Sequence, residues 1–484
     1  MEVENHWIPP TTETVSTETG WLYEILMSAS SFDSSFDEEK VVSTPFTPLK
    51  DDSISSIELG TSTGSDISSS SEFAPFPTPR KQPPQEVPNM AEAEEFRKMQ
   101  LPIPPLQPNI QGTPGVWDSL SAIASYSMMN LMLLFVPLGI VAHYFFQRDP
   151  SNSISLMSFS SNLLALAPLT GLLNFATDEM FLEAGGRKCH PLGILLRSIF
   201  SNSPQLVVLF LSLLSGMPGL AQYTLMGIFA YNLLLTFGFC FFVAGARLNI
   251  SEYSQMVPRG QSWILLVCTV ILLAPTTTAG IIDSAIILTV SRVLAFVLLA
   301  IFLLYVFMAR CRHQYSLMHY EEDVIQDDYE RSLNLPISML LFAVCMILIS
   351  FHADYLIEST PAAIRASFLT EGLVGFVLIP GGINSMVYLA SVSEAFQGNM
   401  TRSTSCILHK TIELALFLAP ASVVMGLALG VGMSFAFPLV GAVTTLTAVL
   451  FIALLFVIGQ GASMFSGILL MLLYLLSSIF LWLL

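Results

Sequence analysis

An apolar stretch at residues 190–216 is interrupted by Arg197, Asn202, Pro204 and Gln205. Polar side chains and a proline-broken backbone are costly in the hydrocarbon core of a bilayer, unless they are buried in protein or line a wet cavity. The stretch therefore indicates a site within a membrane that handles an ion or a polar group.

A second interrupted stretch, residues 378–388, reads Leu-Ile-Pro-Gly-Gly-Ile-Asn-Ser-Met-Val-Tyr and contains Asn384. Two interrupted hydrophobic segments at corresponding places in two halves of a chain point to the central site of a secondary transporter. We expect both helices to be broken and to face each other across that site.

The composition is that of a polytopic membrane protein and not of a soluble enzyme, because 53% of the 484 residues are hydrophobic and 11% are charged. The first 100 residues hold 18 acidic and 6 basic residues, a balance of −12 out of the total net charge of −17. The chain has no basic patch for nucleic acid. The six cysteines have neither pairing motifs nor zinc-site spacing, so we predict no cofactor and no metal site from spacing alone.

Composition divides the chain into four regions. Residues 1–115 are predicted to be a disordered, acidic tail rich in Ser, Thr and Pro. Residues 125–310 form a first membrane region, residues 311–334 an acidic loop, and residues 335–484 a second membrane region.

Eleven stretches are apolar enough and long enough, at about 20 residues, to cross a bilayer as helices. The predicted spans are 129–147, 154–177, 190–216, 222–246, 262–282, 285–309, 335–357, 366–395, 404–428, 431–457 and 461–484. The acidic loop separates helices two to six from helices seven to eleven. The predicted fold is therefore all-α, with a five-plus-five inverted repeat and one extra N-terminal helix.

Several segments resemble one family of transporters: LMLLFVPLGIVAHYFF, LLALAPLTGLLNFATDEM, YTLMGIFAYNLLLTFGFCFFVAGARLNISEY and FVIGQGASMFSGILLMLLYLL. They are similar to fungal vacuolar calcium/proton exchangers of the cation/Ca²⁺ exchanger superfamily. The resemblance covers about residues 125–484 and implies two broken helices, each with a Gly-Asn-Ala-x-Glu motif whose carboxylate binds the divalent cation or protons. It also implies a vacuolar or other endomembrane location, with membrane lipid, cations and protons as partners.

Both exchange carboxylates of the family are replaced in this chain. In the first motif the family's Asn falls on Asn202 and its Glu on Gln205; in the second motif they fall on Asn384 and Val387. The Gln carbonyl is a weak ligand that does not take up or release protons, and Val can neither ligate a cation nor carry a proton. Tyr388 stands where the family usually has His.

The supporting helices differ from the family as well. The family's Gly-Ser pair after the second motif falls on His409 and Lys410, and its Gln falls on Glu413. In the first repeat the family's Asn survives as Asn232, and the Asn shortly before the first motif becomes Arg197. Lys410 and Arg197 are thus expected near the position of the dication, where they would repel Ca²⁺. We expect ordinary Ca²⁺/H⁺ exchange to be lost or altered.

Two other functions stay open at this point. One is a membrane-embedded enzyme that uses an intramembrane carboxylic acid on a small lipophilic substrate, for example to cyclise a prenyl chain. Its candidate acids are Glu413, Asp178 and Glu179. The other is a non-transporting regulatory scaffold that acts through the N-terminal tail.

Overall fold

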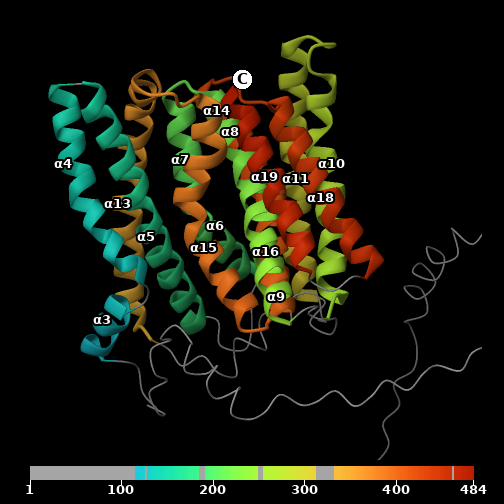
Figure 1. Ribbon diagram of the computed structural model, residues 1–484, viewed down its shortest axis with the longest axis horizontal. Coiled ribbons are helices and arrows are strands. Elements are labelled where there is room, and N and C mark those ends of the chain that lie inside the picture. The colour runs from blue at the N-terminus through green and yellow to red at the C-terminus, as the bar shows by residue number, and fades with distance from the viewer. Residues whose placement is uncertain are drawn as a thin grey trace, which may run out of the picture. The chain divides into compact units, whose positions relative to one another are not determined.

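The computed structural model describes residues 115–125, 128–149, 151–184, 191–248, 254–311, 332–459 and 463–483. These residues form a helical bundle without a named β-strand (Figure 1). Within them, ten helices are long and apolar enough to cross a membrane, and one bent pair makes an eleventh span. The prediction of eleven spans is confirmed, while the predicted tail and acidic loop lie almost entirely outside the described residues.

The helices follow the predicted order of one extra helix and two repeats of five spans. Before the repeats come α3 (Val116–Ser125), η1 (Met128–Leu134) and α4 (Phe135–Arg148). The first repeat consists of α5 (Asn152–Ala184), α6 (Pro191–Ser201), α7 (Ser203–Leu214), α8 (Pro218–Ala230), η2 (Tyr231–Thr236), α9 (Phe237–Leu248), α10 (Met256–Thr278) and α11 (Ser284–Cys311). The second repeat consists of α13 (Leu335–Ala366), α14 (Glu371–Leu373), η3 (Val374–Leu378), α15 (Ile379–Phe396), α16 (Met400–Glu413), η4 (Leu414–Leu418), α17 (Ala419–Leu429), α18 (Leu439–Ile458) and α19 (Met464–Leu483).

Contacts between the two repeats are reciprocal. Helix α15 packs on α5 as α7 packs on α13, and α19 packs on α9 as α11 packs on α17. The first helices of the repeats, α5 and α13, pack against each other, and α4 packs beside both (Figure 1). Equivalent pairings in the two halves are the expected result of a pseudo-two-fold repeat.

The break between α6 and α7 bends the span by 58° at Asn202. Its cause is Pro204, which has no N–H to donate and whose ring crowds the carbonyl four residues earlier. That carbonyl, on Phe200, accepts instead from the Ser203 hydroxyl at 2.7 Å. The Asn202 amide Nδ2 donates to the Ser198 carbonyl at 2.8 Å. The two residues that precede Pro204 therefore supply side-chain hydrogen bonds to backbone carbonyls at the break.

The second predicted break is wrong, because Glu371–Phe396 runs as one helical span through Pro380. The reason is a π-helical turn, η3, in which the Ile379 N–H bonds to the Val374 carbonyl five residues back. The wider turn lets the backbone pass a proline while remaining helical. The turn η4 uses the same device before Pro420, where the Ala419 N–H bonds to the Leu414 carbonyl.

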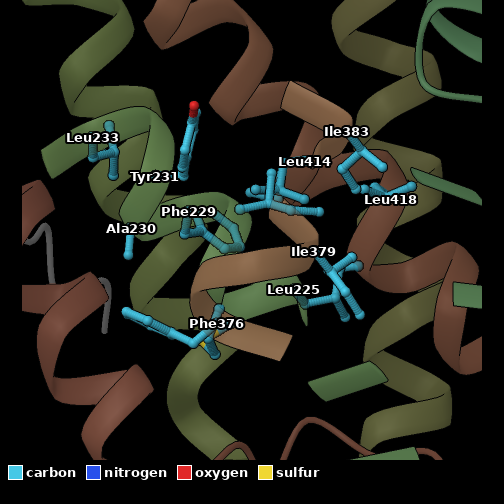
Figure 2. Close-up of a cluster of buried hydrophobic side chains, with 14 of the residues drawn as sticks. Leu225, Phe229, Ala230, Tyr231, Leu233, Phe376, Ile379, Ile383, Leu414 and Leu418 are labelled. Carbon is cyan, nitrogen blue, oxygen red and sulfur yellow. The ribbon is translucent and has the colours of Figure 1, made fainter. Parts of the chain in front are cut away.

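A cluster of buried apolar side chains joins the repeats where α8 and η2 meet η3, α15 and η4 (Figure 2). Gly227 lets the backbones of α8 and η3 approach closely at this crossing. A Cβ on Gly227 would lie 2.5 Å from the Phe376 carbonyl oxygen and 2.6 Å from its Cα. Because both obstacles are backbone atoms, no rotamer change can make room.

Gly227→Ala is therefore expected to destabilise the protein, by about 1–3 kcal/mol for overpacking. The matched control is Gly193→Ala in α6, where nothing lies within 4 Å of an added Cβ. At position 193 Ala has a higher helix propensity than Gly, so the free energy of unfolding should be equal to or slightly above that of the wild type. Thermal unfolding of the purified variants checks this, and equal melting temperatures for the two would contradict the close approach.

Candidate functional site

A pocket lies between the repeats, beside the break in the α6–α7 span. Its walls come from both repeats: Ser201, Asn202, Gln205, Ile228, Asn232, Asn384, Val387, Lys410, Leu414 and Leu418. Among them are six of the residues predicted from the sequence for the central site: Asn202, Gln205, Asn232, Asn384, Val387 and Lys410. Leu414 and Leu418 also belong to the apolar cluster of Figure 2.

The Glu413 carboxylate lies directly behind this pocket and accepts hydrogen bonds on both oxygens. Its Oε1 accepts from the Ser198 hydroxyl, and its Oε2 accepts from Asn202 Nδ2 at 3.1 Å and from Lys410 Nζ at 3.2 Å. His409 Nε2 lies 3.5 Å from Oε1. The Glu413 side chain is 3% exposed, so the carboxylate is a buried anion held by α6 and α16 together.

Lys410 provides the positive charge of the site. Its ammonium donates to Ser201 Oγ at 2.8 Å as well as to Glu413. The side chain is 25% exposed and, unlike Glu413, contributes to the pocket wall. His409 lies on the other side of Glu413, with its Nδ1 at 3.3 Å from the Tyr305 hydroxyl of α11. Lys410 and Glu413 therefore form an ion pair without net charge beside the pocket, and the Lys410 ammonium is the member that lines it.

Two amides meet where the family resemblance places the two Asn-containing motifs. Gln205 Nε2 donates to Asn384 Oδ1 at 2.9 Å, which joins α7 of the first repeat to α15 of the second. The remaining Gln205 Oε1 and Asn384 Nδ2 are buried without a hydrogen-bond partner in the described part of the chain. Both residues line the pocket, so one acceptor and one donor of this pair have no protein partner beside it among the described residues.

Three predicted site residues lie elsewhere. Arg197, expected near the dication, donates from Nη2 to Asp178 Oδ1 at 3.0 Å, and these side chains are 50% and 55% exposed. Glu179 is buried, but its carboxylate accepts the backbone N–H groups of Ser332 and Leu333 at the entry to α13. Arg197, Asp178 and Glu179 do not line the pocket.

Sequence reasoning missed two residues that contact the site, Ser198 and Tyr305. Ser198 lies in the last turn of α6, and Asn202, four residues later, directly follows that helix; both side chains therefore reach the same carboxylate. That spacing was the available signal for Ser198. Tyr305 reaches His409 from α11, a contact that no spacing could show.

Comparison with known proteins identifies the family. The model of the sodium/calcium exchanger protein family matches residues 154–310 and 337–483, which together are more than half of the chain. The chain belongs to this exchanger family. It is an integral membrane protein with the exchanger fold, as the resemblance implied.

Individual relatives agree with this assignment. The chain is 30% identical over 305 residues to the vacuolar calcium ion transporter of Schizosaccharomyces pombe, a match that covers 62% of this chain and 71% of that protein. It is 26% identical over 313 residues to a Ca²⁺/H⁺ antiporter of Aphanothece halophytica, a match that covers 62% of this chain and 81% of that protein.

Solved structures show the exchanger fold. Native YfkE aligns with a TM-score of 0.62 at 20% identity, covering 74% of this chain and all of that one. The H⁺/Ca²⁺ exchanger CAX aligns with a TM-score of 0.56 at 11% identity, covering 76% and 92%. In this exchanger-family chain, the pocket between the repeats is lined by four amide side chains, four apolar side chains, one hydroxyl and one ammonium.

Proposed function

We propose that this protein is an exchanger-family membrane protein of the vacuolar or another endomembrane in which ordinary Ca²⁺/H⁺ exchange is lost. The location and the ancestral activity are inferred from relatives named as vacuolar calcium transporters and Ca²⁺/H⁺ antiporters. The observation that carries the proposal is the composition of the pocket wall. In the part of the chain that the structure describes, the wall contains an ammonium and no carboxylate.

A dication that enters the pocket must exchange its hydration water for oxygen ligands of the protein. Ca²⁺ takes about six to eight oxygen ligands, several of them usually from carboxylates. The wall offers amide and hydroxyl oxygens from Asn202, Gln205, Asn232, Asn384 and Ser201. Neutral oxygens alone do not repay the loss of the hydration shell of a doubly charged ion.

The ammonium of Lys410 adds a repulsion. A bare unit charge about 4 Å from a dication costs roughly 8 kcal/mol at an effective dielectric constant near 20. Glu413 offsets part of this, but its carboxylate stands behind the wall and both of its oxygens already accept hydrogen bonds. The net result is a pocket whose nearest formal charge is positive.

The geometry gives less support to the enzyme alternative. A general acid must hold a proton to donate, whereas Glu413 accepts from an ammonium, a hydroxyl and an amide, which favours its anionic form. Asp178 pairs with Arg197 at the surface, and Glu179 accepts backbone N–H groups. The scaffold alternative depends on residues 1–115, which lie almost entirely outside the described residues.

The test is calcium tolerance and vacuolar Ca²⁺ uptake in yeast cells that lack their own exchanger and express this chain. We expect no rescue of growth in high calcium and no proton-driven uptake above that of the empty vector. A known exchanger expressed in the same cells is the positive control, and an immunoblot of vacuolar membranes shows that this chain is inserted. Restored tolerance with normal uptake would overturn the proposal.

A further inference from the structure

We propose that the ammonium of Lys410 is a tethered cation, which fills a cation position of the central site in place of a bound ion. This proposal rests on the proposed loss of exchange and gives a cause for it. The Lys410 side chain permanently occupies the cation position, so an ion cannot bind there. Three features support this proposal: the atoms around Nζ, the helix end beside it and the hydrogen bonds that hold Glu413.

The atoms around Nζ are those that would hold a small monovalent cation. Ser201 Oγ lies 2.8 Å away and Glu413 Oε2 lies 3.2 Å away. One is a neutral hydroxyl and the other carries a full negative charge. They come from different repeats: the half-buried Ser201 lies in α6 and the buried Glu413 lies in α16.

The end of α6 favours a positive charge at the same place. Helix α6 ends at Ser201, the residue whose hydroxyl Lys410 contacts. The last carbonyls of a helix carry a partial negative charge that stabilises cations within about one turn. Discontinuous membrane helices commonly use such ends to hold coupling ions. The break at Asn202 therefore places the end of α6, with the Ser201 hydroxyl, beside the position that the ammonium fills.

The negative partner is also positioned independently of Lys410. The Ser198 hydroxyl donates to one oxygen of Glu413, and Asn202 Nδ2 donates to the other at 3.1 Å. His409 lies 3.5 Å away on the same helix. Removing the lysine side chain would thus leave an oriented, buried carboxylate beside a vacated space, and a mobile cation could enter that space.

The experiment compares thermal unfolding of the purified full-length wild type and Lys410→Ala in chloride salts of sodium, potassium and n-propylammonium. Propylammonium has the size and charge of the group that Lys410→Ala removes. Choline chloride keeps the ionic strength constant with a cation too bulky for the site. We expect a saturable rise of several degrees in the melting temperature of Lys410→Ala with at least one of the small cations, and no comparable rise for the wild type.

The matched control is Lys410→Ala/Glu413→Gln, which removes both charges and should lose the response to cations. If Lys410→Ala does not survive extraction, the same salts are compared in heated, unextracted membranes, with Lys410→Ser as a second variant. A flat response of both single variants, or an equal response of the wild type or the double variant, would overturn the tethered cation. Such a result, with no Ca²⁺ uptake by the wild type, would leave the proposed loss of exchange intact.

Discussion

Glu413→Leu is expected to destabilise the protein severely, by about 3–5 kcal/mol, the usual cost of breaking a buried ion pair from one side. The variant would leave the Lys410 ammonium without its anion in the interior of the bundle. It would also remove the acceptor of the Ser198 hydroxyl and one of the two acceptors of Asn202 Nδ2, which would keep its bond to the Ser198 carbonyl. Much of the loss should therefore come from the ammonium that has lost its anion and from the buried Ser198 hydroxyl that has lost its acceptor. Melting temperature and yield of folded protein in detergent are the measurements.

Two companion variants separate charge from volume. Glu413→Gln keeps the size and one acceptor oxygen, so its stability should lie between those of the wild type and Glu413→Leu. Lys410→Met/Glu413→Leu removes both charges and should recover much of the lost stability, which gives a coupling energy from the double-mutant cycle. If Glu413→Leu melts at the wild-type temperature, Glu413 is not the centre of the polar network.

The second large effect is a gain of Ca²⁺ binding. Gln205→Glu and Val387→Glu return the two carboxylates that the family motifs carry, and Lys410→Ser removes the ammonium from the pocket wall. We expect the triple variant to bind Ca²⁺ at least about tenfold more tightly than Gln205→Glu/Val387→Glu, since a repulsion of only 1.4 kcal/mol corresponds to that factor. Equilibrium dialysis of purified protein with radiolabelled Ca²⁺ measures the difference.

The control for this series is Lys410→Ser alone, which lacks the added carboxylates and should not bind Ca²⁺ measurably. Excess Mg²⁺ in the dialysis tests for nonspecific attraction to the added charge. Equal affinity of the double and triple variants would show that Lys410 does not oppose the dication. Lys410 would then not be the reason for weak Ca²⁺ binding. Its role as a tethered cation would depend on the thermal-unfolding experiments with small cations alone.

Hydropathy alone was enough to predict the number and order of the spans, because a run of about 20 apolar residues matches the thickness of the hydrocarbon core as one helix. It was not enough to distinguish the two proline-containing segments. Pro204 breaks its span at a sharp bend, where the Ser203 hydroxyl satisfies the carbonyl that the proline leaves free. Pro380 does not, because the π-helical turn η3 precedes it. This turn packs against α8 of the other repeat, a contact that the hydropathy of the local sequence does not reveal.

The site was predictable where helical spacing decides it. Lys410 and Glu413 are three apart on α16, and His409 and Glu413 are four apart, so one helix face brings them together. Arg197 was misplaced because it precedes Asn202 by five residues, which is about 140° around an α-helix from the face that carries Asn202. Ser198, one position later, lies on the correct face and contacts Glu413.

Proton-driven Ca²⁺ uptake by proteoliposomes that contain the purified wild-type protein shows directly whether this protein has lost exchange. A vacuolar Ca²⁺/H⁺ exchanger reconstituted at the same density serves as the positive control, and protein-free liposomes serve as the baseline. The wild type should give uptake equal to the baseline at every Ca²⁺ concentration and pH gradient tested. Saturable uptake that collapses with the proton gradient would show that the amides and ammonium of this pocket still support exchange.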